Sequence, residues 1–234
     1  MPTRLTRELA ELRSRLLDMA TIVAEQFTDA VDALLTHDVE KAERVVARDR
    51  EVDQLELEVD DSCQRIMARH QPVATDLRTL LTVEKINTDL ERIGDHCRNV
   101  ARNTKHVTEA PDILEAVKLR EMSQTARRML DDAKQAFLDQ DAELARRIPE
   151  LDDEVDRLHH ENFQELVEYI QAHPEHAEVA AHLITASKAV ERISDHSTNI
   201  AQGVVFLIEG VDIRHAGVQD RPSVGDGSVG DASS

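Results

Sequence analysis

The sequence predicts an all-α protein built from two tandem, internally duplicated three-helix bundles. Its apolar residues are mainly Leu, Ile, Val, Ala and Met, with only four Phe, one Tyr and no Trp, which is typical of helical proteins. Six of the seven Gly follow residue 200, so little in the preceding sequence interrupts long helices. A nine-residue motif also occurs twice, as ERIGDHCRN at 91–99 and ERISDHSTN at 191–199, and this repeat indicates a duplication.

Three helices are expected in the first half of the chain. Apolar residues recur at steps of three and four positions, which predicts a helix over residues 4–36. Asp38 is the expected N-cap of a second helix, which is broken by the sequence HQPVATD at 70–76. Thr75 or Asp76 is then expected to cap a third helix.

After the third helix, which is expected to end near Val107, the helical pattern starts again. Asp38 and Asp49 recur at Asp141 and Asp152, an offset of 103 residues, and the offset falls to 100 for the repeated motif. A shorter connection between the second and third helices of the second unit would account for the difference. The predicted helices of this half cover residues 112–139, 141–172 and 175–209.

Pro149 is the main irregularity in the second unit. It aligns with Val46 of the first unit, where an uninterrupted helix is expected, so it should kink the fifth helix or start a new segment. The residues at the C-terminus contain few apolar side chains, which predicts a flexible tail. The predicted domains are residues 1–109 for the first bundle, 110–211 for the second and 212–234 for the tail.

Each unit contains two pairs of acidic residues spaced four positions apart. Such residues lie one turn apart on the same face of a helix, so their carboxylates can converge. If the second and third helices of a unit pack antiparallel with the pairs at one level, four carboxylates could surround a cation. An all-oxygen site suits Mg, Mn, Ca or Fe ions better than structural Zn. The candidate metal ligands are Asp49, Asp53, Glu91 and Asp95 in the first unit, and Asp152, Asp156, Glu191 and Asp195 in the second.

Surface ion pairs are the alternative explanation for these acids. Arginines lie near them in the sequence at Arg50, Arg92, Arg98 and Arg192, and exposed acids commonly pair with such residues. A purely structural role would not require the acids to keep the same register in both units and on both helices. Their recurrence therefore favours the metal hypothesis.

Histidines are not expected to complete these sites. His96 and His196 directly follow the acids, but on a helix the next residue is turned by about 100°, so they should form hydrogen bonds across the bundle instead. The other nine His show no spacing that indicates a metal site. A ferritin-like di-iron centre requires Glu-x-x-His on two helices; the nearest case, Asp156 with His159, has Glu56 in place of the histidine in the first unit.

Composition excludes several function classes. The net charge of -19, with 47 acidic and 28 basic residues, argues against a nucleic-acid partner. No apolar run approaches the ~20 residues of a membrane span, so direct membrane insertion is not expected. Cys63 and Cys97 form no CxxC pair and are expected to be core residues in a reducing, cytoplasmic compartment. No Gly-rich phosphate loop, GxSxG motif or Cys/His arrangement occurs, so we do not expect an enzyme.

Several motifs together resemble the PhoU family of phosphate-uptake regulators. They are LERIGDHCRNVA and VERISDHSTNIA, the earlier DREVDQL and DDEVDRL, and the ending FLIEGVDIRH. The resemblance extends from about residue 5 to residue 215, and it implies two similar three-helix bundles. It also implies metal clusters on acid-x-x-x-acid motifs, which here fall on the eight acids named above. The second copy has Ser194 where the first has the family's Gly94.

The resemblance also implies a function. Members of this family are negative regulators of the phosphate-starvation response, acting between the cytoplasmic ATPase side of the high-affinity phosphate ABC transporter and a membrane sensor histidine kinase. A cytoplasmic adaptor that modulates phosphate uptake, assembled as a homodimer, is therefore the expected function. A metal-storage or metal-sensing helical protein is the alternative, and a structural coiled coil is a third possibility.

Overall fold

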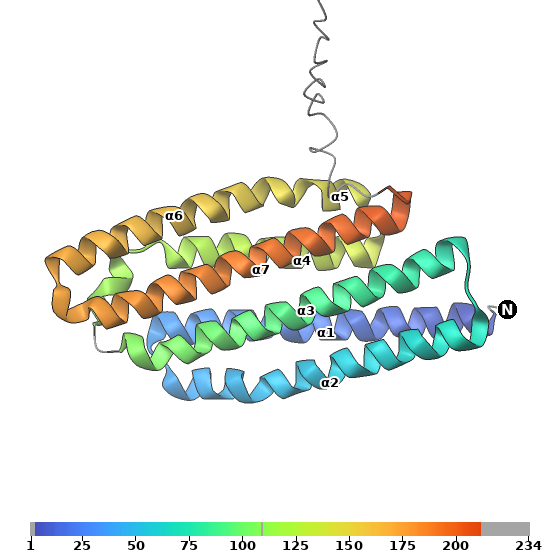
Figure 1. The fold of residues 1–234 in the computed structure, drawn as a ribbon, viewed down its shortest axis with the longest axis horizontal. Coiled ribbons are helices and arrows are strands. Elements are labelled where there is room, and N and C mark those ends of the chain that lie inside the picture. The colour runs from blue at the N-terminus through green and yellow to red at the C-terminus, as the bar shows by residue number, and fades with distance from the viewer. Residues whose placement is uncertain (1–2, 109, 212–234) are drawn as a thin grey trace, which may run out of the picture.

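The computed structural model describes residues 3–108 and 110–211, which form seven α-helices and two short 3-10 helices (Figure 1). Over these residues the fold is all-helical, as predicted. The predicted tail at 212–234 lies outside the described residues, and the domain limit at 109/110 remains a prediction. No helix within the described ranges combines the length and hydropathy of a membrane-spanning segment.

The first unit consists of α1 (Arg4–Thr36), α2 (Val39–His70) and α3 (Ala74–Val107), close to the predicted helices. Asp38 caps α2 as expected, because its carboxylate accepts a hydrogen bond from the backbone N of Lys41 at 2.9 Å. The predicted cap of α3 is wrong. This helix begins at Ala74, directly after the extended residue Val73, so Thr75 and Asp76 lie inside its first turn, where the helix dipole favours an acid.

The second unit is more interrupted than the first. It contains η1 (Pro111–Glu115), α4 (Leu119–Asp139), α5 (Ala142–Arg147), α6 (Pro149–Ala172), η2 (Pro174–His176) and α7 (Ala177–Glu209). The helix predicted over 112–139 therefore starts late, at Leu119. At this start, Asn162 Oδ1 accepts a hydrogen bond from the backbone N of Lys118 at 2.6 Å. Pro149 begins α6 as predicted, since a proline needs no N–H partner at the first helical position.

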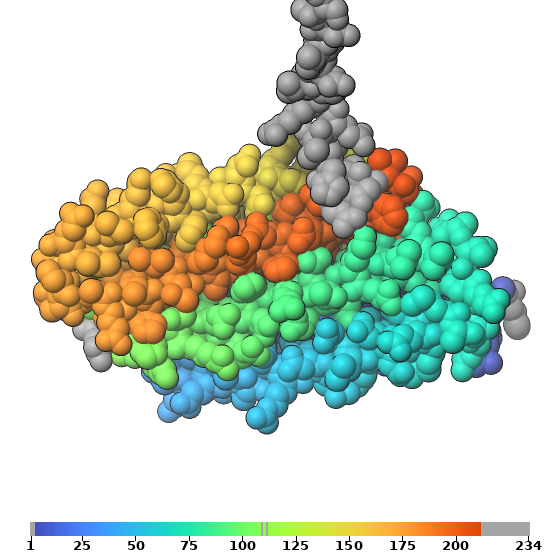
Figure 2. Space-filling view, in the orientation of Figure 1, coloured from blue at the N-terminus to red at the C-terminus, as the bar shows by residue number. Residues whose placement is uncertain are grey.

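The helices form two layers (Figures 1 and 2). Helices α2, α3, α7 and α6 follow one another across one face, and α1 and α4 pack against each other behind them. The most extensive helix–helix contact joins α3 to α7, which belong to different units and run antiparallel (Figure 1). The duplicated units are therefore packed side by side through their third helices.

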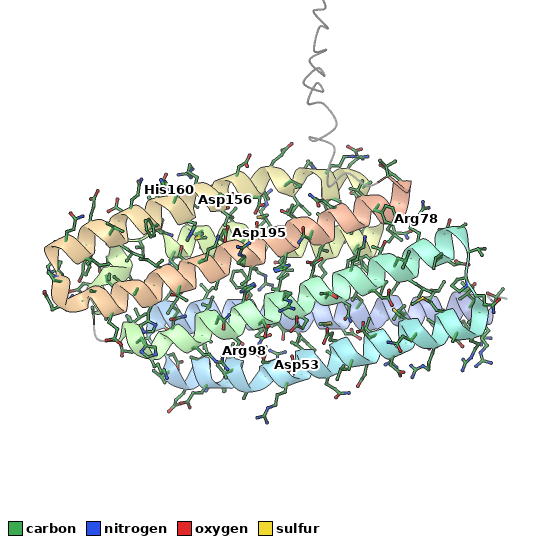
Figure 3. The ribbon with its side chains drawn as sticks, viewed as in Figure 1. Asp53, Arg78, Arg98, Asp156, His160 and Asp195 are labelled. Atoms are coloured by element: carbon green, nitrogen blue, oxygen red, sulfur yellow. The ribbon has the colours of Figure 1, made fainter. Side chains whose placement is uncertain are left out.

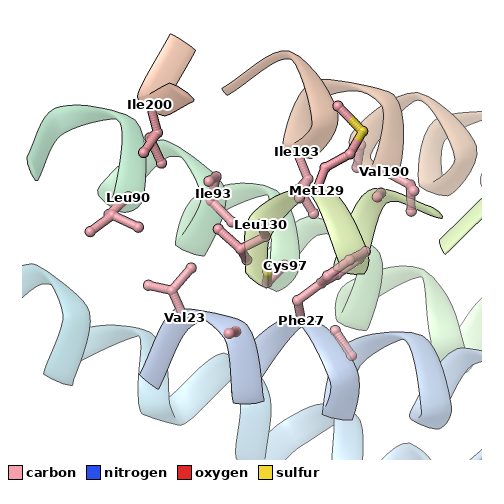
Figure 4. Close-up of a cluster of buried hydrophobic side chains, with 14 of the residues drawn as sticks. Val23, Phe27, Leu90, Ile93, Cys97, Met129, Leu130, Val190, Ile193 and Ile200 are labelled. Atoms are coloured by element: carbon pink, nitrogen blue, oxygen red, sulfur yellow. The ribbon is translucent and has the colours of Figure 1, made fainter. Parts of the chain in front are cut away.

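The two units share one hydrophobic core. Apolar side chains from α1, α3, α4 and α7 meet at its centre, as Figure 4 shows for Val23, Phe27, Leu90, Ile93, Cys97, Met129, Leu130, Val190, Ile193 and Ile200. Each fully buried side chain of this size contributes about 1.5–3 kcal/mol to folding. Cys63 and Cys97 are both buried, so the prediction that they are core residues is confirmed.

Candidate metal centres

The predicted acid pairs lie on adjacent helices in both units. Helix α2 provides Asp49 and Asp53 and packs against α3, which provides Glu91 and Asp95; helices α6 and α7 repeat this arrangement with Asp152, Asp156, Glu191 and Asp195. We call these two sets the first and second quartets. Figure 3 shows Asp53 and Arg98 between α2 and α3, and Asp156 and Asp195 between α6 and α7. Both quartets therefore belong to the same layer of four helices.

An arginine bridges the first quartet. Arg98 of α3 forms an ion pair with the buried carboxylate of Asp49 on α2, and its Nη2 lies 2.5 Å from Asp95 Oδ1. The amide of Gln26 is also 3.4 Å from Asp49 Oδ1. The ion-pair alternative is therefore realised at this position, and a cation could bind all four acids only if Arg98 moved away.

Gly94 allows the close approach of α2 and α3 at the first quartet. A Cβ atom at this position would lie 3.2 Å from Val52 Cγ1 and 3.7 Å from Asp49 Oδ1. Both neighbours are buried on α2. The glycine within the repeated motif therefore has a packing role that brings α2, and with it Asp49, close to the backbone of α3.

Negative charge extends beyond the first quartet along α2 and α3. Burial and the neighbouring Asp95 raise the pKa of Glu91. Burial also raises the pKa of Glu56 and of Glu84, and Asp60 acts in the same direction on both. Glu56, Asp60 and Glu84 were not among the predicted ligands, although Glu56 and Asp60 have the same four-residue spacing. A cation would relieve the repulsion among these carboxylates.

The second quartet is crowded with carboxylates that repel one another. Burial raises the pKa of Asp156, and Glu191 and Asp195 raise it further. Burial is also the main cause of the raised pKa of Asp152, opposed by the nearby hydroxyl of Ser194. That hydroxyl donates its proton to the backbone O of Glu191 at 2.6 Å, and the hydroxyl of Thr198 also lies near Asp152. Asp152 Oδ1 is buried and accepts no hydrogen bond of ordinary geometry from the described residues. An unpaired carboxylate oxygen of this kind fits a cation ligand.

Basic side chains also approach the second quartet. The Nζ atom of Lys188 lies 2.5 Å from Glu191 Oε2, and Arg192 Nη1 lies 3.0 Å from Asp195 Oδ2. Both bases come from α7 and are about half exposed, so they can turn outward more easily than Arg98. Among the described residues, neither quartet has three ligand atoms within 4.8 Å of one another. Metal binding by the eight acids therefore remains a prediction.

Of the two histidines in the repeated motif, His196 forms the expected hydrogen bond across the bundle, whereas His96 has none among the described residues. The Nδ1 atom of His196 on α7 lies 2.8 Å from Asp89 Oδ1 on α3, which confirms a hydrogen bond across the bundle. The rings of His96 and His196 stack with centroids 5.7 Å apart. Burial, assisted by His196, lowers the pKa of His96 to about 4. His159 Nδ1 is hydrogen-bonded to the hydroxyl of Ser187 at 2.9 Å.

The prediction for the remaining histidines needs correction. The ligand atoms of His106, Glu178 and His182 all lie within 4.8 Å of one another, and the same is true of His173, Glu175 and His176. One signal was present in the sequence, because Glu178 and His182 are four positions apart on one helix. The contribution of His106 could not be predicted, since it lies on α3 and depends on how the two units pack.

Comparisons with known proteins match both units. The PhoU domain matches the chain twice, over residues 16–104 and 119–204, which agrees with the duplication predicted from the repeated motif. The Phosphate-specific transport system accessory protein PhoU homolog of Pseudomonas aeruginosa is 38% identical over 212 residues, covering 90% of this chain and 88% of that protein. The accessory protein PhoU of Escherichia coli is 30% identical, covering 90% of this chain and 87% of that protein.

Solved structures have the same fold. The crystal structure of PhoU from Pseudomonas aeruginosa superposes with a TM-score of 0.83 at 36% identity, covering 89% of this chain and 100% of that chain. The phosphate transport system regulatory protein PhoU from Streptococcus pneumoniae gives a TM-score of 0.82 at 26% identity, covering 90% and 99%. These names describe accessory and regulatory proteins and do not describe enzymes. The chain belongs to the PhoU family of phosphate-specific transport system accessory proteins.

Proposed function

We propose that this protein is a negative regulator of the phosphate-starvation response. It acts in the cytoplasm as a homodimeric adaptor that docks on the ATPase side of the phosphate ABC transporter and on a sensor histidine kinase, and it keeps the kinase inactive when phosphate is plentiful. In doing so it modulates phosphate uptake. Each unit binds divalent cations between its second and third helices through its quartet.

The observation that carries this proposal is the match to PhoU accessory proteins across both units. The charge of the chain supports an adaptor function, because an excess of 19 negative charges steers association toward basic surfaces on protein partners. Bound cations would neutralise part of this charge at the quartets.

Deletion of the gene tests the regulatory function. In phosphate-rich medium the deletion should switch on phosphate-starvation genes, and the wild-type gene supplied in trans should switch them off again. Unchanged expression in the deletion strain would contradict the proposal. A pulldown from phosphate-replete cells should recover the transporter ATPase and the histidine kinase, and recovery of neither would contradict the adaptor function.

A metal-storage or metal-sensing protein is the second candidate function. The grouping of partly buried carboxylates on adjacent helices favours it, because burial and then neighbouring acids raise the pKa values of Glu91, Asp152 and Asp156. Elemental analysis of the purified protein and of the Asp95→Ala and Asp195→Ala variants separates the two functions. Loss of metal together with intact phosphate regulation would show that regulation does not depend on the ion.

A further inference from the structure

A cluster of nitrogen and oxygen ligands lies where the last turn of α3 meets the first two turns of α7. His106 comes from the first unit, and Glu178 and His182 come from the second. Their ligand atoms all lie within 4.8 Å of one another, with Glu178 exposed and both histidines half-buried. The cluster is separate from the quartets, which contain no histidine.

Asn103 fixes the orientation of His182. The side-chain Nδ2 of this buried asparagine donates to the backbone O of Asn99 at 2.7 Å, which leaves its Oδ1 facing His182 Nδ1 at 2.8 Å. A carbonyl oxygen only accepts hydrogen bonds, so Nδ1 of His182 carries the proton and Nε2 has a free lone pair. Metal-binding histidines are typically held in this way, with the other ring nitrogen donating to an oxygen.

The two imidazole rings already lie against each other. Their centroids are 3.8 Å apart and their planes differ by 6°. The nitrogen lone pairs of two parallel rings point in parallel directions and do not converge on one ion. The ring of His106 must therefore tilt before both histidines can bind the same ion. Its position one residue before the end of α3 allows this movement.

We propose that His106, Glu178 and His182 bind a divalent transition-metal ion that links α3 of the first unit to α7 of the second. Two imidazoles and one carboxylate suit Zn²⁺, with water completing the coordination. This donor set contrasts with the all-oxygen quartets, which suit harder cations. Because the ion contacts both units, binding stabilises their interface in the folded protein.

The second histidine cluster provides a matched control. His173, Glu175 and His176 fall within a span of four residues, within and next to η2. Two of the three are exposed, and His176 Nδ1 is 3.0 Å from the hydroxyl of Tyr169. This cluster does not link α3 to α7. Removing His173 and His176 therefore tests whether Zn²⁺ binds to histidines outside the contact between the two units.

Calorimetric titration of the full chain with Zn²⁺ in excess Mg²⁺ tests the proposal. Glu178→Gln, at an exposed position, should weaken Zn²⁺ binding at least about tenfold, and His106→Gln/His182→Gln should remove this binding step. His173→Gln/His176→Gln and Asp95→Ala/Asp195→Ala should retain it. Zn²⁺ should also raise the Tm of the wild type but not that of His106→Gln/His182→Gln.

Two results would overturn the proposal. One is wild-type Zn²⁺ affinity in both Glu178→Gln and His106→Gln/His182→Gln. The other is loss of the binding step in His173→Gln/His176→Gln, which would assign it to the exposed cluster. Circular dichroism of each variant without Zn²⁺ checks folding, and Glu178→Gln alone decides the question if the double variant does not fold.

Discussion

At the scale of single residues, Arg98 is the basic side chain that pairs with two acids of the first quartet. It neutralises Asp49, whose side chain is only 5% exposed, and it contacts Asp95 as well. The sequence indicated that Arg98 and Asp95 could pair, because they are three positions apart on one helix. It could not indicate the pairing with Asp49, which depends on the register between α2 and α3.

Arg98→Met should therefore destabilise the protein in the presence of a chelator. The change leaves the buried Asp49 carboxylate without its cationic partner, and we expect a loss of about 3 kcal/mol in the free energy of unfolding. Arg92→Met is the control, because that side chain is 57% exposed and its ion pairs should contribute at most about 1 kcal/mol. Urea unfolding measures both. An equally small loss of unfolding free energy in both variants would show that Arg98 does not neutralise Asp49.

The ionised side chain of Glu8 should stabilise the folded protein in a pH-dependent way. Hydrogen bonds from Arg4, His70 and Arg69 lower its pKa from 4.5 to about 2. Between these values the folded protein binds fewer protons than the unfolded chain, so the contribution is complete above about pH 4.5 and is lost as the pH falls toward 2.

Glu8→Gln should therefore lower the Tm at pH 7, and the difference from wild type should shrink as the pH falls below 4.5. Glu11→Gln on the same helix is the control, since Glu11 is exposed and forms no ion pair with the other described residues. A difference in Tm for Glu8→Gln that does not vary with pH would contradict this assignment.

At the scale of helices, local signals in the sequence predicted most boundaries. The Asp38 cap and the break at Pro149 both depend on neighbouring residues only, and both are confirmed. The late start of α4 includes a hydrogen bond from Lys118 to Asn162, which is 44 residues away. No local pattern could reveal that contact, and the start predicted at residue 112 was wrong because residues 111–115 form the separate helix η1.

Two glycines within helices provide a test of how closely the helices pack. A Cβ at Gly94 would meet the buried Val52 at 3.2 Å, whereas a Cβ at Gly203 would be 3.6 Å from Thr82 Cγ2, an ordinary contact. Alanine is favoured over glycine inside a helix by about 1 kcal/mol. Overpacking a core typically costs about 1–3 kcal/mol.

Gly203→Ala should therefore raise the free energy of unfolding by up to about 1 kcal/mol, and Gly94→Ala should lower it by about 1–2 kcal/mol. Chemical denaturation of the two variants under identical conditions gives the comparison. An equal gain in both would mean that α2 can shift away from α3 without cost, and that Gly94 is not required for their close approach.

At the scale of the whole molecule, the duplication was predictable but the packing of its halves was not. The repeated motif and the offsets of 100 and 103 residues are properties of the sequence. The antiparallel pairing of α3 with α7 follows from the shapes of two apolar faces, and it determines which residues of the two units meet. The cluster at His106, Glu178 and His182 follows from that pairing.

The same packing places both quartets in one layer of the molecule, where α2 meets α3 and α6 meets α7. Carboxylates within each quartet have raised pKa values because burial and neighbouring acids disfavour their charge. Cations at both positions would stabilise the folded protein and reduce the negative charge that its partners meet. In the proposed function, cation binding by the quartets would therefore connect the duplicated fold to regulation.

Anomalous diffraction from crystals grown with Mn²⁺ tests this connection most directly. We expect one ion or more among Asp49, Asp53, Glu91 and Asp95 with Arg98 displaced, and the equivalent among Asp152, Asp156, Glu191 and Asp195. Crystals in which Arg98 still pairs with Asp49, and in which neither quartet has an anomalous peak within bonding distance of its carboxylates, would contradict the account.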